Sequence, residues 1–352
     1  MKKRHMVIPI FVPHKGCPYD CIYCNQKTIS GQIDEMTEEK MIEIVDSHLK
    51  SSDDSFNIEI GFYGGSFTGI ERNQQIKHLK AANQYVKSGK VNGIRLSTRP
   101  DYINEEILYY LKKYNVNTIE LGVQSLDDSV LKMSCRGHSA DIVFKSSSLI
   151  KSFGFNLGIQ TMIGLPGDSK EKDLYTARRI IDIAPSMVRI YPTLVIKDTY
   201  LEKLYLKGEY TPLKLDEAVE ISACLLELYN QNSIKVIRIG LQTTERINKN
   251  SDITAGPFHP AFRQLVESRL ILKKMEEQII SKKLSPNSRI LITTGKTDVS
   301  NVVGQKGNNI RYLKEKYNFS DVRIQCTGKE NSELTISSID TGAKDIFRRK
   351  LK

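Results

Sequence analysis

The strongest constraint on the fold is an alternation of short β-type runs with longer amphipathic helical patterns between Met6 and Ile239. The runs cover residues 7–12, 57–63, 93–97, 117–123, 155–162 and 187–192. Helix-length segments follow several of them in place of tight turns, which is typical of parallel β/α units and not of hairpins. The sequence therefore predicts an α/β fold in which six units form a partial parallel (β/α)6 barrel.

A second, smaller domain is expected, because 352 residues exceed what one hydrophobic core usually accommodates. Residues 215–232 and 261–284 have helical patterns beyond the sixth unit, and the segment 284–288, Leu-Ser-Pro-Asn-Ser, then interrupts the pattern. We place the domain boundary there. The barrel with its helical extension would occupy residues 1–284, and a small α+β domain residues 285–352.

The sequence gives no sign of a membrane span or an export signal. No run approaches the roughly 18 to 20 apolar residues that a span needs, and Pro9 and Pro13 interrupt the short apolar stretch near the basic N-terminus. The six cysteines are too few for a disulfide framework, and three of them crowd into residues 17–24. We therefore expect a cytoplasmic protein with a metal site and no membrane partner.

Polar and glycine motifs follow the predicted strands. Cys17 follows the first run, Gly64-Gly65 the second, Ser97 ends the third and Gln124 ends the fourth. In parallel barrels the chemistry gathers at the carboxyl ends of the strands, in the loops that lead into the helices. We expect these residues to meet at one edge of the barrel.

Cys17, Cys21 and Cys24 give the pattern C-x3-C-x2-C on one short loop. Three thiolates so placed suit a [4Fe-4S] cluster with one iron left open, because such a cluster usually takes four cysteines. The alternative is a structural zinc site completed by His14. Zinc loops normally arrive as two separated pairs on a small module, and this triplet instead begins a long β/α array, which favours iron and sulfur.

With Tyr23 before the last cysteine, this pattern is similar to the signature of the radical S-adenosylmethionine (SAM) superfamily. The resemblance implies that the open iron binds the methionyl group of SAM and that the reduced cluster cleaves SAM to a 5′-deoxyadenosyl radical. It also implies an electron donor such as ferredoxin or flavodoxin. Gly64 and Gly65 match the superfamily's glycine motif for the methionyl amine, and Ser66 stands where an acidic residue is usual.

Ser97, Gln124 and Arg136 lie in further motifs that resemble the radical domain of the Elongator catalytic subunit and its bacterial relatives. This resemblance covers about residues 6–265 and implies SAM contacts for the three residues. Elongator spaces its first two cysteines further apart and carries an acetyltransferase domain that this sequence does not contain. The resemblance therefore does not carry over a carboxymethylation that depends on acetyl-coenzyme A, and the sequence does not identify a co-substrate.

The C-terminal part is basic and contains a G-x-x-G loop. Residues 281–352 hold 15 Lys and Arg against 7 Asp and Glu, so +8 of the net charge of +11 lies there. Gly304, Gln305, Lys306 and Gly307 separate two predicted helices within a β-α-α-β-β-α order, which looks like a KH domain. Such a loop lets the backbone of single-stranded RNA approach helix amides, and Lys306 adds positive charge.

Together these features predict a radical SAM enzyme that modifies a base of tRNA or rRNA. By analogy with Elongator, the first candidate target is ring carbon 5 of a uridine. The base would be unpaired or flipped, because a base inside a duplex is unreachable. Two alternatives stay open. One is a radical SAM enzyme acting on a small molecule such as a tetrapyrrole, and the other is a non-enzymatic RNA-binding protein with a structural cluster. The sequence identifies neither a catalytic residue nor the oligomeric state.

Overall fold

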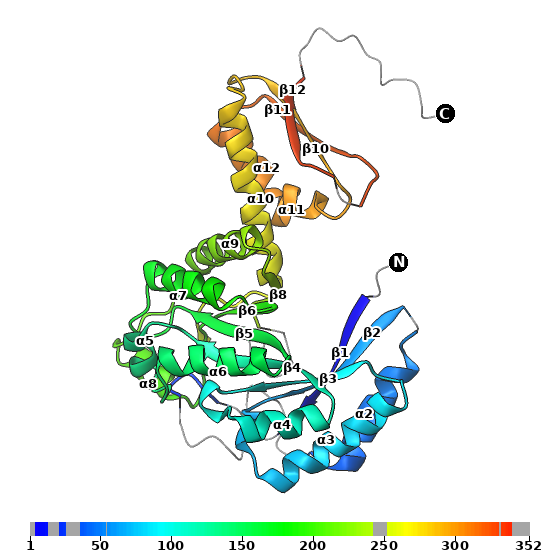
Figure 1. Ribbon diagram of the computed structural model, residues 1–352. Helices are drawn as coiled ribbons and strands as arrows, with labels where there is room; N and C mark the ends of the chain where they lie inside the picture. Colours follow the sequence, from blue (N-terminus) through cyan, green and yellow to red (C-terminus); the bar gives the residue numbers. More distant parts are fainter. Residues whose placement is uncertain are drawn as a thin grey trace. The chain divides into compact units, whose positions relative to one another are not determined.

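The computed structural model describes residues 4–12, 21–25, 36–53, 55–241, 252–330 and 332–339. Its chain divides into two compact units, Met1–Pro260 and Ala261–Lys352. Each unit has a sheet and helices of its own (Figure 1).

Seven strands of the first unit form one open sheet in which every neighbouring pair is parallel. In sheet order they are β1 (Arg4–Phe11), β2 (Phe56–Tyr63), β3 (Gly93–Thr98), β4 (Val116–Gln124), β5 (Asn156–Ile163), β6 (Met187–Pro192) and β8 (Lys235–Ile239). The predicted α/β fold with parallel β/α units is confirmed. The sequence interpretation missed β8, which adds a seventh strand at the sheet edge.

The helices of the first unit lie in the segments that connect these strands, and most of them cover one face of the sheet (Figure 1). They are α2 (Glu38–Lys50), α3 (Arg72–Lys87), α4 (Glu105–Lys113), α5 (Asp128–Met133), α6 (Ala140–Ser152), α7 (Lys170–Ile183), α8 (Tyr200–Leu206) and α9 (Leu215–Gln231). Several begin at a residue whose side chain accepts a backbone N–H of the first turn, as Asn104 and Ser169 do. Two strand segments, β7 (Val195–Ile196) and β9 (Ile253–Ala255), form a small antiparallel pair.

The strands alternate between two kinds of side chain, and this alternation positions the candidate site. In β4, Ile119, Leu121 and Val123 are fully buried, whereas Glu120, Gly122 and Gln124 occupy the alternate positions. Successive side chains of a strand point to opposite faces of a sheet. One face of the sheet therefore packs against the helices, and the other carries polar residues and glycines; we call this second face the inner face.

The second unit combines one long helix with a three-stranded sheet. It contains α10 (Phe262–Ser281), β10 (Arg289–Thr294), α11 (Val299–Val303), α12 (Asn308–Lys316), β11 (Asp321–Cys326) and β12 (Thr335–Ser338). The central strand β10 pairs in parallel with β11 and antiparallel with β12. The last helix expected from the sequence falls in residues that lie outside the described part.

The second unit begins before the predicted boundary between residues 284 and 285. Leu272, Met275 and Ile279 of α10 share one hydrophobic core with Ile290 and Ile292 of β10. The helical pattern shows that α10 has an apolar face, but not which core that face joins.

None of the described helices combines the length and the apolar character that a membrane span requires.

Candidate active site

The cysteine segment is described from Cys21 to Asn25, and Cys17 and His14 lie outside the described residues. The N–H of Cys24 donates to the carbonyl of Cys21 over 2.9 Å, which folds the segment into a turn. Ile22 fixes this turn to the rest of the unit. Its N–H donates to the Ser134 carbonyl over 3.3 Å, and its carbonyl accepts from the Leu201 N–H over 2.7 Å. The turn therefore has a defined place beside α5 and α8.

Two buried arginines lie next to the Cys21 sulfur. Arg136 Nη1 is 3.3 Å from Cys21 Sγ, and Arg99 Nη1 is 4.0 Å from the same atom. Arg136 also donates to the Gly122 carbonyl, while Arg99 binds both carboxylate oxygens of Asp101 at 2.9 and 3.0 Å. The exposed fractions are 5% for Cys21, 7% for Arg136 and 1% for Arg99.

These surroundings suit an iron–sulfur cluster. Thiolates are the usual ligands of such clusters, and a cluster held by several thiolates carries net negative charge that nearby cations stabilise. The Tyr23 hydroxyl is buried, and burial is the main cause that raises the pKa of Tyr23, to which the neighbouring Cys21 and Cys24 add. Cys21 thus presents its sulfur beside two cationic side chains, and the buried Tyr23 phenol lies in the same turn.

The glycine motif lies beside the end of β1. Val12 N–H donates to the Tyr63 carbonyl over 2.8 Å, so the chain after β1 runs alongside the chain after β2. Gly64 has a φ of 98°, and a Cβ there would come within 3.1 Å of the Val12 carbonyl oxygen. Only glycine takes up this conformation readily. Gly65 and the buried Ser66 follow, and Ser66 makes no side-chain cap for the 3₁₀ turn Phe67–Gly69.

Ser97 and Gln124 are half-buried residues at the carboxyl ends of β3 and β4. Ser97 Oγ accepts from Gln160 Nε2 over 3.1 Å. Gln124 has a φ of 71° and follows a β-bulge in β4. A Cβ built at Gly122 would lie 3.0 Å from Arg136 Nη2 and 3.1 Å from Gln124 Nε2. The structure thus brings Cys21, Arg136 and Gln124 together at one end of the sheet.

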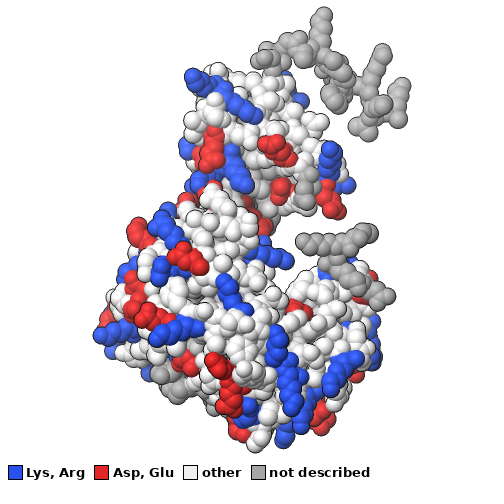
Figure 2. All heavy atoms as spheres, in the orientation of Figure 1, with Lys and Arg blue, Asp and Glu red and all other residues white. Residues whose placement is uncertain are grey.

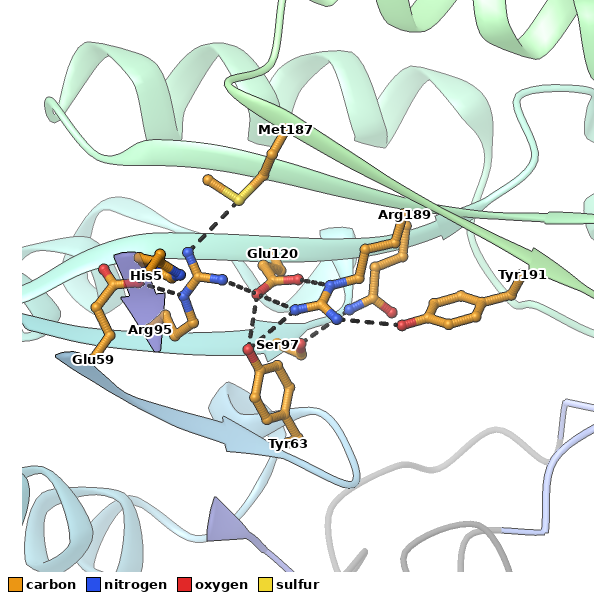
Figure 3. A network of polar contacts seen from close by, with 10 residues as sticks. His5, Glu59, Tyr63, Arg95, Ser97, Glu120, Met187, Arg189 and Tyr191 are labelled. Carbon is orange, nitrogen blue, oxygen red and sulfur yellow. Dashed lines mark hydrogen bonds and ion pairs between the residues drawn. The ribbon is translucent and has the colours of Figure 1, made fainter. Parts of the chain in front are cut away.

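A charge network on the inner face was missed by the sequence interpretation (Figure 3). Glu120, which is 1% exposed, accepts from Tyr63 Oη at 3.1 Å and from Arg95 Nη1 at 3.2 Å. Arg189 Nη2 donates to the same carboxylate at 3.1 Å and to Tyr63 Oη at 3.2 Å. On one side the network continues through Glu59, which binds Arg95 Nε at 2.9 Å and His5 Nε2 at 2.7 Å. On the other side Arg189 Nη1 donates to Tyr191 Oη over 3.5 Å.

This network makes the inner face a fixed set of polar groups. Burial lowers the pKa of Arg189, but Glu120, Tyr191 and Tyr63 together outweigh this effect, so the pKa of Arg189 is raised. Burial raises the pKa of Tyr63. Arg189 therefore stays charged and Tyr63 stays neutral over the physiological range. The sequence contains one sign of this network. Polar residues recur at every second position of adjacent strands, as Arg95 and Ser97 do in β3.

A second candidate site is the G-x-x-G loop of the second unit. Gly304 and Gly307 have φ values of 74° and 77°, and the exposed Lys306 between them has a φ of 53°. Asn309 Nδ2 fixes the loop by donating to the Ser268 carbonyl at 3.2 Å and the Asn301 carbonyl at 3.0 Å. The loop precedes α12, and its backbone therefore has a defined shape that is anchored to α10 and α11.

The second unit carries an excess of basic residues in its sequence. Residues 281–339 contain ten Lys and Arg and five Asp and Glu, and the rest of the +8 belongs to residues 340–352. Figure 2 shows that both signs are interspersed on the visible face of the second unit. Lys316, for example, pairs with Glu276 at 2.6 Å.

An open parallel β/α sheet with a cysteine turn and a glycine motif at its carboxyl edge is the arrangement that the resemblance to radical SAM proteins predicts. The model of the radical SAM superfamily matches residues 11–180, and the model of the radical SAM C-terminal domain matches residues 185–272. The chain belongs to the radical SAM superfamily. This confirms the resemblance on which the sequence interpretation rests.

Among its relatives is the tRNA uridine(34) acetyltransferase of Methanocaldococcus infernus, which is 35% identical over 153 residues. That match covers 42% of this chain and 29% of the relative. Elongator complex protein 3 of Homo sapiens is 33% identical over 142 residues, which are 40% of this chain and 26% of the relative. The chain therefore aligns with less than a third of the length of each of these two curated relatives.

A solved structure shares the fold of this protein. The archaeal Elp3 of Methanocaldococcus infernus superposes with a TM-score of 0.64 at 22% identity, over 84% of this chain and 72% of that chain. At this level of identity the superposition shows the fold, and it agrees with the parallel β/α architecture described above.

Proposed function

We propose that this protein is a radical SAM enzyme that modifies an RNA base. The first candidate substrate is a uridine of tRNA, and the second is a base of rRNA. The proposal rests on one juxtaposition, the cysteine turn beside the inner face of the sheet. The names of the relatives, a tRNA uridine(34) acetyltransferase and an Elongator complex protein, support RNA as the substrate. Ring carbon 5 of the uridine is the proposed target.

We assign the cluster to Cys17, Cys21 and Cys24. When bound, a reduced [4Fe-4S] cluster supplies the electron that cleaves SAM to a 5′-deoxyadenosyl radical. SAM would lie along the carboxyl edge of the sheet, against Tyr23, Gly64, Gly65, Ser66, Ser97, Gln124 and Arg136. The absence of a side chain at Gly64 leaves the backbone accessible to a small charged group. Ferredoxin or flavodoxin is the proposed electron donor.

The inner face would receive the base. Tyr63, Gln160, Arg189 and Tyr191 are half-buried, so part of the surface of each residue remains accessible to a ligand. The Gln160 amide can accept the N3–H of a uracil ring, because its carbonyl is separate from the Nε2 that donates to Ser97. Fixed donors and acceptors would orient the ring and exclude water from the reacting carbon.

The G-x-x-G loop would recruit the RNA. Gly304, Gln305, Lys306 and Gly307 are proposed to bind the backbone of a single-stranded segment, which presents an unpaired base to the first unit. This assigns a KH-like role to residues 285–352, together with helix α10. RNA modification by such an enzyme fits a cytoplasmic protein.

Nucleoside mass spectrometry of RNA from cells with and without the protein tests the proposal. We expect one modified nucleoside to disappear from the tRNA or rRNA of the deletion strain and to return when the gene is restored. Anaerobically reconstituted protein with dithionite and SAM should release 5′-deoxyadenosine. Cleavage of SAM without any altered nucleoside would point to a small-molecule substrate and overturn the proposal, and a bound cluster without cleavage would point to a structural role.

A further inference from the structure

We propose that Arg136 is a positioning residue that raises the reduction potential of the cluster by donating a hydrogen bond to the Cys21 sulfur, with Arg99 adding positive charge. This inference rests on the [4Fe-4S] cluster assigned above. It gives Arg136 an effect on the cluster itself, separate from any contact with SAM.

The guanidinium of Arg136 is held in place from several sides. Its Nη1 lies 3.3 Å from Cys21 Sγ, within the range of a hydrogen bond to sulfur, and its Nη2 donates to the Gly122 carbonyl. The main chain is fixed as well, because the Arg136 carbonyl accepts from Arg99 Nη2 over 2.6 Å. Arg136 is therefore a rigid donor aimed at one sulfur and not a mobile surface side chain.

Burial gives this contact its electrostatic weight. Arg136 is 7% exposed and Cys21 5%, so the charge acts on the sulfur with little screening by water. Arg99 reaches the same sulfur only at 4.0 Å and is also paired with Asp101, so its influence should be the smaller.

A hydrogen bond and a positive charge at a ligand sulfur stabilise the more electron-rich, reduced state of a cluster. Both raise the reduction potential. A higher potential lets a cellular electron donor of moderate strength reduce the cluster. Loss of the Arg136 donor should therefore lower the potential, and it should do so before any SAM is added.

The experiment compares reconstituted wild-type protein with Arg136→Gln, Arg136→Lys and Arg99→Gln in an anaerobic redox titration without SAM. The fraction of reduced cluster is followed by electron paramagnetic resonance, and iron and sulfide contents are measured. Arg178→Gln, on an exposed arginine of the same unit, is the matched control. Because SAM is absent, a residue that only contacts SAM leaves the titration unchanged.

At the wild-type midpoint potential, we expect the ratio of reduced to oxidised cluster to be about tenfold lower in Arg136→Gln. This corresponds to a midpoint potential about 59 mV lower for a one-electron reduction. Arg136→Lys and Arg99→Gln should shift less in the same direction, and Arg178→Gln should not shift. A fully loaded Arg136→Gln protein with the wild-type midpoint overturns the inference. If that variant does not retain iron, an unchanged midpoint in both Arg136→Lys and Arg99→Gln overturns it. Wild-type protein without iron and sulfide would instead contradict the proposed function.

Discussion

Single buried charges carry much of the organisation of the inner face. Glu120 joins β4 to β2 through Tyr63, to β3 through Arg95 and to β6 through Arg189, so one carboxylate links four strands. Buried charges persist in a protein core only when they are paired. The network therefore fixes the relative positions of residues that chain order keeps far apart, including Tyr63, which directly precedes Gly64.

The Glu120→Gln substitution should be strongly destabilising. It removes the carboxylate that pairs with both Arg95 and Arg189. Glu59 still pairs with Arg95, whereas Arg189 is left without a carboxylate among the described residues. Breaking such a pair costs about 3–5 kcal/mol. Urea denaturation should show this loss in the free energy of unfolding, and Glu209→Gln at an exposed position should change it by less than about 0.5 kcal/mol. Equal stabilities of the two variants would refute the role of Glu120.

Asp173 predicts a pH dependence of stability. Burial, and next the neighbouring Asp168, raise the pKa of Asp173 from 3.8 to about 10. Between these values the folded state holds a proton that the unfolded state has lost. The contribution of Asp173 to the free energy of unfolding is fully present below the pKa of the unfolded state. It is lost as the pH rises toward the pKa of the folded state, at up to about 1.4 kcal/mol per pH unit.

Asp173→Asn removes this titration. The stability of the variant relative to wild type should therefore increase from pH 5.5 to pH 8.5, as measured by urea denaturation at each pH. Asp182→Asn, at a position exposed on the same helix α7, is the control and should keep a constant difference. Parallel pH profiles of wild type and Asp173→Asn would contradict the assignment.

The elements show what the sequence can and cannot predict. The sequence locates strands such as β2 and β6 to within a residue, because alternating apolar residues and helix-length connections define them. Strand β8 was missed because Lys235 and Arg238 interrupt its apolar pattern at the sheet edge. The sequence predicts where Cys21, Gly64 and Gln124 lie, because the loops after parallel strands gather at one edge of the sheet. It does not predict the Glu120 network, because that network depends on the register between strands.

The two glycines of the G-x-x-G loop should respond differently to alanine. A Cβ at Gly304 would lie 2.8 Å from Asn309 Cγ and 2.9 Å from its backbone nitrogen, whereas a Cβ at Gly307 meets nothing within 4 Å. Gly307→Ala carries only the cost of a left-handed backbone, about 1–2 kcal/mol. Gly304→Ala adds the displacement of Asn309 and should lower the melting temperature and RNA affinity further. Equal melting temperatures would contradict the described loop.

At the scale of the molecule, the two proposed activities belong to different units. Cys21 and Cys24 lie in the first unit and the G-x-x-G loop in the second, which has a hydrophobic core of its own. A substitution in one unit should therefore leave the chemistry of the other intact.

Cys24→Ala should abolish cluster binding and cleavage of SAM while RNA affinity stays within about twofold. Gln305→Asp combined with Lys306→Asp should weaken RNA binding, because two added carboxylates repel the phosphate backbone, and should leave SAM cleavage without RNA unchanged. Filter binding and 5′-deoxyadenosine release measure the two properties. Loss of both properties in either variant would show that the units are not independent.

The packing of α10 determines where the second unit can be separated from the first. Leu272, Met275 and Ile279 each contribute about 1.5–3 kcal/mol by burial, which together approaches the whole stability of a small domain. A recombinant fragment starting at residue 285 would leave Ile290 and Ile292 open to water and should aggregate during purification. A fragment starting at residue 258 retains the helix and should elute as a single folded species in gel filtration.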